Sequence, residues 1–228
     1  SAAGVAWLLR PVPAPTGVCG VVVDPATRDR ALVVVRGAAG WLNRTDLDPG
    51  VQAALEGANV VYCTSFVLST PERAATVEQI AIEAAEAGGI LVLNLSSPGL
   101  QRRVQPIVQK LLPMVSILFG NEAEFEAFCD INSMDITEIP TLLAPGGVAV
   151  VTAGESPTTL VTTVGATAIP VPPLDGPVMS TNGTRDSFVA GCLAALVNRG
   201  TLEQAVAASH RAAARTVTLG RAAAAAAG

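Results

Sequence analysis

From Ala58 onward, short apolar runs alternate with longer stretches whose apolar positions repeat at helical spacing. The run ANVVYC (58–63) has strand composition, and the stretch after it opens at Thr70 and Pro71 and ends at Gly88. The strand-like run ILVLNLS (90–96) follows directly. A strand, a helix long enough to cross over and a second strand predict a βαβ unit with parallel strands.

The same alternation continues toward the C-terminus. The pattern predicts helices at 100–112, from 121, near 136–143, at 186–198 and from 202, strands at 115–120 and 148–154, and a hairpin over 158–171. We therefore expect a three-layer α/β/α domain with a mostly parallel sheet of at least five parallel strands. Ligands of such sheets bind at the carboxyl ends of the strands.

The N-terminal part has a different pattern. Pro11, Pro13 and Pro15 stand at alternate positions, which predicts an extended connector rather than a helix. The runs VCGVVV (18–23) and ALVVV (31–35) have strand composition and flank a turn-forming segment. They predict a hairpin that ends at the glycines of 37–40.

Composition narrows the class of protein. The 228 residues are 50% hydrophobic and 4% aromatic, which suits one α/β domain, and the net charge of −5 gives no reason to expect nucleic acid as a direct ligand. The four cysteines lie far apart without a CxxC spacing, and we interpret them as reduced core residues. The sequence shows neither a membrane span nor a signal pattern, so we expect a soluble intracellular protein of the cytoplasm or of an organelle such as the mitochondrion.

The segment STNGTRDSFVAG (180–191) follows a loop rich in proline and glycine and leads into an apolar helix. Backbone N–H groups at the N-terminus of a helix point outward and attract anions such as phosphate. Asp186 in this position could accept the proton of an attacking hydroxyl group. In isolation, Thr184 or Asp186 would more often be a simple helix cap.

This segment resembles the C-terminal signature of the ribokinase-type (PfkB) sugar and nucleoside kinases, Asp-Thr-x-Gly-Ala-Gly-Asp. Four positions of the signature are present, namely Thr181, Asn182, Gly183 and Asp186. The continuation Phe188, Val189 and Gly191 is similar to the adenosine kinases of that family, as are PTG (15–17), LNLSSP (93–98), ILFGNEAE (117–124) and SHRAA (209–213). The resemblance runs from about Pro15 to Gly220 with the motifs in family order.

The resemblance implies a ribokinase-like fold and a role for each matching position. Asp186 would be the catalytic base, and the backbone of Gly183, Thr184 and Arg185 would form the anion hole. Asn121 and Glu124 would organise Mg²⁺ and its waters, and Phe66 would face the nucleoside. The nucleotide would contact four further residues, Asn94, Thr152, Gly154 and His210.

Residue type alone favours simpler roles for several of these positions. Asn121 and Glu124 would then be a helix cap and a solvated carboxylate. Thr152 with Gly154 would be an ordinary strand end, His210 a surface or core histidine, and Phe66 a core aromatic.

The chain departs from the signature in the anion hole, where Arg185 stands in place of a glycine. A long side chain hinders the close approach of phosphate to the backbone, so we expect the anion hole to be distorted or filled. The alternative is that Arg185 binds phosphate itself. Ser180, Ser65 and Gly40 also stand where the family usually has aspartate, glycine and asparagine.

The family's first ~100 residues, a large part of one α/β domain, have no counterpart in this sequence. We therefore expect residues 1–228 to form a single ribokinase-like domain that lacks the family's N-terminal strands and part of its lid, with a protein partner or an N-terminal part covering the incomplete sheet. The preferred hypothesis is a degenerate, catalytically impaired adenosine kinase-like protein that serves as a structural or binding subunit.

Two active alternatives stay open. The first is an adenosine kinase that converts adenosine and ATP to AMP and ADP with Mg²⁺ and with Asp186 as base. The second is a kinase for another sugar or nucleoside. Mg²⁺ and ATP are the expected cofactors of an active protein, and an inactive one would need none.

Overall fold

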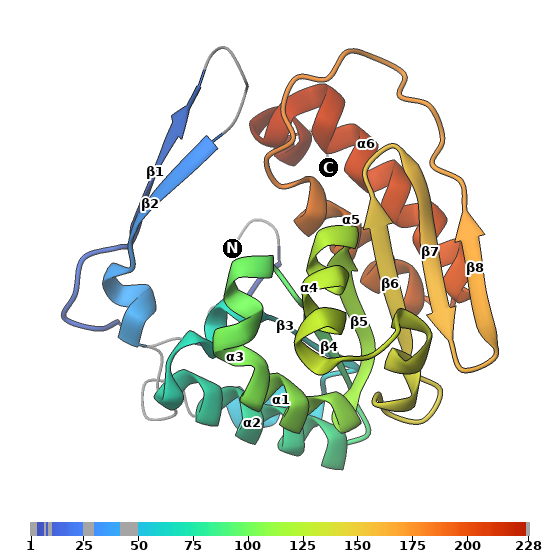
Figure 1. Ribbon diagram of the computed structural model, residues 1–228. Coiled ribbons are helices and arrows are strands. Elements are labelled where there is room, and N and C mark those ends of the chain that lie inside the picture. The colour runs from blue at the N-terminus through green and yellow to red at the C-terminus, as the bar shows by residue number, and fades with distance from the viewer. Residues whose placement is uncertain (1–3, 7, 9–10, 25–29, 42–49, 227–228) are drawn as a thin grey trace.

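The computed structural model describes residues 4–6, 8, 11–24, 30–41 and 50–226. The strands β1 (Val18–Val23) and β2 (Arg30–Val35) pair antiparallel in a sheet of their own, as the sequence predicts. This ribbon stands apart from the main body (Figure 1). It joins the body through η1 (Gly37–Trp41) and α1 (Gly50–Glu56).

The main sheet has the strand order β3-β4-β5-β6-β7-β8. Its members are β3 (Val60–Thr64), β4 (Ile90–Asn94), β5 (Val115–Asn121), β6 (Val148–Ala153), β7 (Ser156–Thr162) and β8 (Gly165–Ile169). Strands β3 to β6 pair in parallel, and β7 and β8 are antiparallel. The mostly parallel sheet is confirmed, but its parallel part among the described residues has four strands, one fewer than the five expected.

Helices cover both faces of the sheet, which gives the expected three layers. Alternate residues of each strand point to opposite faces. Leu91 and Leu93 pack with α2 (Pro71–Glu86), α3 (Pro98–Leu111) and α4 (Glu122–Asn132), whereas Val92 and Phe119 pack with α5 (Thr184–Val197) and α6 (Leu202–Ala226). Figure 1 shows these two groups of helices on the two sides of the strands.

Local signals in the sequence explain where the helices begin. The side chain of Thr70 caps α2, and Pro71 occupies its first turn, where a missing N–H costs nothing. The helix expected near 136–143 is instead the short 3₁₀ helix η5 (Ile136–Thr141). Pro140 lies inside it and provides no N–H for continuation as an α-helix.

Helices α5 and α6 pack closely at Gly191. A Cβ atom at this position would lie 2.9 Å from the carbonyl oxygen of Ala208 and 3.0 Å from the Cα of Ser209, both on α6. Glycine is therefore required for this close approach, which fixes the position of α5 behind the sheet. In the part of the chain that the structure describes, no helix has the length and apolar character needed to cross a bilayer.

Candidate functional site

The carboxyl ends of β3, β4 and β5 meet the N-terminus of α5 at one rim of the sheet. Helix α5 begins after Gly183, whose φ of 78° favours glycine, and its N-terminus has no side-chain cap. Thr184 and Asp186 are therefore not capping side chains, although Asp186 lies in the first turn. The side chain of Asp186 is exposed.

Arg185 connects α5 to two other elements of this rim. Its Nη2 lies 2.7 Å from Oε1 of Glu124, and its Nη1 donates to the carbonyl oxygen of Ser96 at 2.8 Å. The side chain of Arg185 is 37% exposed, whereas that of Glu124 is 1% exposed. The structure thus brings the 184–186 segment and Glu124 together, as the resemblance implies, and the guanidinium joins them.

Asn121 and Glu124 form a reciprocal cap at the start of α4. The Glu124 N–H donates to Oδ1 of Asn121 at 2.8 Å, and the Asn121 N–H donates to Oε2 of Glu124 at 3.0 Å. Both carboxylate oxygens of Glu124 are therefore engaged, one by this cap and the other by Arg185.

This arrangement leaves Glu124 no oxygen for direct coordination of a divalent metal ion, and the predicted organisation of Mg²⁺ through its waters is not tested by this geometry. A carboxylate that binds Mg²⁺ directly needs an accessible oxygen, and Glu124 is buried with both oxygens in use. Within the described ranges, no group of three or more His, Cys, Asp or Glu side chains is gathered as a metal site.

The turn after β4 holds Ser96 in an unusual backbone conformation. Its φ of 67° is rare for a residue other than glycine. The side-chain oxygen of Asn94 accepts from the Ser96 N–H at 3.0 Å, and the Ser96 hydroxyl donates to the Asn94 carbonyl at 3.0 Å. Asn94 is 1% exposed, so its side chain orders the turn that directs the Ser96 carbonyl at Arg185.

Tyr62 is a site residue that the sequence interpretation missed. Its hydroxyl oxygen accepts from Nδ2 of Asn94 at 3.4 Å. The pKa of Tyr62 is raised, mainly by burial, and the negative charge of Asp186 raises it further. The phenol of Tyr62 therefore lies within electrostatic reach of Asp186. The available signal was that it is the single tyrosine of the chain and lies in the strand-like run ANVVYC. Ser96 was also missed as an individual residue, although it lies inside the matching segment LNLSSP.

Phe66 lies on the 3₁₀ helix η3 (Ser65–Ser69), directly after β3. Its side chain is 57% exposed, so it is not a core aromatic. The preceding Ser65 is buried, and its hydroxyl donates to the carbonyl of Leu95 at 2.5 Å. A glycine, which the family usually has at this position, could not make this side-chain hydrogen bond.

The other predicted nucleotide contacts lie farther along the sheet. The Thr152 hydroxyl donates to the Gly120 carbonyl at 3.3 Å, and Gly154 follows β6 with a φ of 63° and open space at its Cβ position. His210 on α6 is 5% exposed, and its Nε2 lies 2.9 Å from the Thr158 hydroxyl.

His210 is thus held in the layer between α6 and the sheet. Its ring also packs at 5.6 Å from the ring of Phe188, and burial lowers its pKa. The contacts described for His210 are those of a hydrogen-bonded core histidine, and its predicted role beside a nucleotide is not tested by this geometry.

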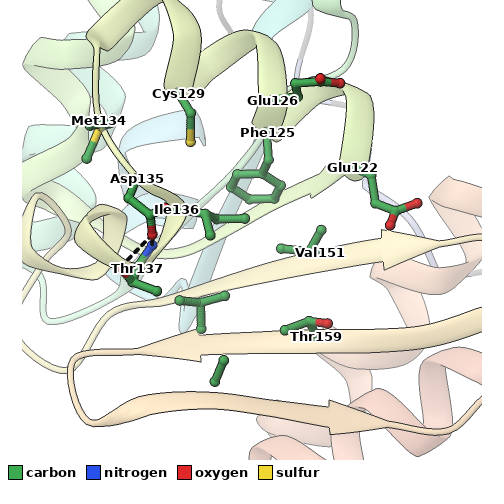
Figure 2. Close-up of a pocket in the computed structure, with 12 residues that line it drawn as sticks. Glu122, Phe125, Glu126, Cys129, Met134, Asp135, Ile136, Thr137, Val151 and Thr159 are labelled. Carbon is green, nitrogen blue, oxygen red and sulfur yellow. Dashed lines mark hydrogen bonds between the residues drawn. The ribbon is translucent and has the colours of Figure 1, made fainter.

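A separate pocket of about 460 Å³ lies under α4, on the face of the sheet opposite to α5 (Figure 2). Its floor includes Phe125, Ile136 and Val151, and Glu122 and Asp135 lie at its border. Figure 2 shows these side chains between α4, η5 and the strands β6 and β7. The predicted site residues are not among those that line it.

The rim has the chemistry of an anion site with a carboxylate beside it. The uncapped N-terminus of α5 carries the positive end of the helix dipole, and Arg185 adds a full positive charge. The exposed carboxylate of Asp186 is free of the ion pair that occupies Glu124, so it could accept a proton from a hydroxyl group placed at the rim.

Comparison with known proteins gives one consistent result. Residues 4–226 match the model of the pfkB family carbohydrate kinases. The adenosine kinase of Schizosaccharomyces pombe is 30% identical over an alignment of 214 residues that covers 86% of this chain and 61% of that protein. The adenosine kinase of Saccharomyces cerevisiae is 29% identical over an alignment of 201 residues that covers 84% of this chain and 58% of that protein.

Solved structures agree with the sequence match. Anopheles gambiae adenosine kinase, in complex with P1,P4-di(adenosine-5) tetraphosphate, superposes with a TM-score of 0.83 at 27% identity over 93% of this chain and 65% of that one. The apo adenosine kinase of Trypanosoma brucei brucei gives a TM-score of 0.79 at 27% identity, over 90% and 65%. The chain therefore spans about 58–65% of the length of these relatives. From the match over residues 4–226 and these superpositions, we conclude that the chain belongs to the pfkB family of carbohydrate kinases.

Proposed function

We propose that this chain is an adenosine kinase-like protein in which phosphoryl transfer is impaired, and that it serves as a binding or structural subunit of a larger assembly. The observation that carries the proposal is the contact of Arg185 with Glu124 and Ser96 at the N-terminus of α5. The guanidinium fixes the segment where a transferred phosphoryl group would need free backbone N–H groups.

The edge of the main sheet at β3 would accommodate a partner in the subunit role. Strand β3 is the first in the order of the main sheet, and among the described strands it pairs only with β4. Unpaired strand edges favour pairing with another chain. A protein partner that pairs along β3, or an N-terminal part of a longer protein, would cover this edge and the half-exposed side chains of the strand.

The second candidate is an active adenosine kinase, and one observation favours it. Asp186 is exposed in the first turn of α5. Two aromatic side chains are exposed as well, Tyr62 within β3 and Phe66 directly after that strand. A nucleoside stacked on Phe66 would bring a hydroxyl group toward this rim, where Asp186 would act as base and ATP with Mg²⁺ would supply the phosphoryl group.

The deciding experiment is AMP formation from adenosine, ATP and Mg²⁺ by the purified protein. The comparison includes the double variant Thr184→Ala/Arg185→Gly, which restores the Gly-Ala-Gly-Asp part of the family signature, and Asp186→Asn, which removes the base. Because one donor to a developing negative charge is worth ~10² to 10³ in rate, we expect the natural protein to be at least ~10²-fold slower than the repaired variant, or both to be inactive. Robust turnover by the natural protein that Asp186→Asn abolishes would establish the active kinase instead.

A further inference from the structure

Arg185 and Glu124 form an ion pair whose two members have very different surroundings. Glu124 is 1% exposed, and the only full positive charge that the described contacts place on it is the Arg185 guanidinium, 2.7 Å away. A buried carboxylate is stable in its charged form only when a cation or strong hydrogen-bond donors compensate it. Arg185 therefore supplies the positive charge that this part of the rim needs.

The guanidinium retains hydrogen-bonding capacity beyond this pair. Arginine has N–H groups on three nitrogens, and the two described contacts use Nη1 and Nη2 once each. The side chain is 37% exposed at the N-terminus of a helix without a side-chain cap. Part of its donor set can therefore face an anion at the same rim, where the dipole of α5 also favours negative charge.

We propose that Arg185 is a built-in cation that replaces a divalent metal ion beside Glu124, so that this rim binds nucleotide phosphates without Mg²⁺. The inference rests on the proposed binding function and specifies its ligand as an uncomplexed nucleoside phosphate. Its basis is the misfit described above, because Glu124 offers no accessible oxygen to a metal while a guanidinium occupies its outer side.

The first test measures ATP binding by calorimetry, once with Mg²⁺ and once with EDTA. The natural protein should bind ATP under both conditions with dissociation constants that agree within about 3-fold. Arg185→Met should weaken binding in EDTA by about 10- to 100-fold, since a charge-assisted hydrogen bond is worth that much, and Arg185→Lys should restore part of it. Arg199→Met serves as the matched control, because Arg199 is an exposed arginine just beyond the opposite end of α5.

The second test asks directly whether Glu124 binds a metal ion. Paramagnetic Mn²⁺ is titrated into the natural protein and into Glu124→Gln, and free Mn²⁺ is measured by electron paramagnetic resonance. We expect no stoichiometric Mn²⁺ site in either protein. Circular dichroism of each variant establishes that it is folded.

Several results would overturn the proposal. They are ATP binding that requires Mg²⁺, ATP binding in EDTA that Arg185→Met leaves unchanged, no ATP binding under either condition, and stoichiometric Mn²⁺ binding that Glu124→Gln removes. Adenosine binding and AMP formation are measured separately. Rapid AMP formation would contradict the proposed function but not this inference. If adenosine still binds and ATP binding strictly requires Mg²⁺, this inference is contradicted and the proposed function is not.

Discussion

The ion pair between Arg185 and Glu124 makes a quantitative prediction about stability. An exposed ion pair contributes at most ~1 kcal/mol, whereas removal of one partner of a fully buried pair costs ~3–5 kcal/mol. Here Glu124 is 1% exposed and Arg185 is 37% exposed, so the pair lies between these limits. The change Arg185→Met also removes the hydrogen bond to the Ser96 carbonyl, worth ~1 kcal/mol. We expect it to lower the free energy of unfolding by ~2–3 kcal/mol.

A double-mutant cycle separates the pair from the other effects of the substitution. Urea unfolding, followed by circular dichroism, is measured for Arg185→Met, Glu124→Gln and the double variant. We expect a coupling energy of ~1–2 kcal/mol, because the double variant no longer buries an uncompensated carboxylate. Arg199→Met should stay within ~0.5 kcal/mol of the natural protein, as a surface change. If Arg185→Met does the same, the pair is no stronger than a surface contact and the reasoning is refuted.

Three further predictions concern stability and reactivity. Burial lowers the pKa of His210, so the unfolded state binds its proton more readily below pH ~6.5, and the free energy of unfolding should fall as the pH drops from ~7 to ~5. His210→Gln should flatten that part of the profile, and an unchanged profile would contradict the assignment. Gly191→Ala should cost ~1–3 kcal/mol in urea unfolding, because its methyl group would push α5 away from α6, and a neutral effect would show that the helices yield freely. Burial raises the pKa of Cys63 to about 12 and that of Cys192 to about 11, so few of these thiols are reactive thiolates at pH 8. A thiol reagent at that pH should therefore modify the exposed Cys19 first in the folded protein. Equal modification rates for the three cysteines would contradict this prediction.

The layered fold could be predicted because its signals are local. Apolar runs such as ILVLNLS alternate with capped helical segments, and each such run became a strand of the main sheet. The sequence also indicated a helix start at 121, and the structure confirms Asn121 as its cap, whereas Glu124 is buried in a reciprocal cap and is not a solvated carboxylate. The helical interpretation of 136–143 was wrong in type, because Pro140 and the short length favour a 3₁₀ helix.

The partners of the site residues could not be predicted in the same way. Arg185 and Ser96 are 89 residues apart in the sequence, and only the folded sheet brings them together. The sequence predicted a disturbed anion hole, but not that the guanidinium would pair with Glu124. Tyr62 was missed because a strand tyrosine is usually a packing residue, and its proximity to Asp186 depends on the register of β3 against β4.

The ribbon of β1 and β2 has a consequence for how the molecule fluctuates. Valines are exposed on both of its faces, for example Val21 at 51% on one and Val22 at 63% on the other, so they contribute little buried apolar surface. A two-stranded ribbon without a packed face is only marginally stable. One described link to the body is the bond from Nη1 of Arg73 to the Ala39 carbonyl, beyond the end of β2. Amide protons of the ribbon should therefore exchange with solvent by local opening, long before those of β4 and β5, whose exchange requires the whole domain to unfold.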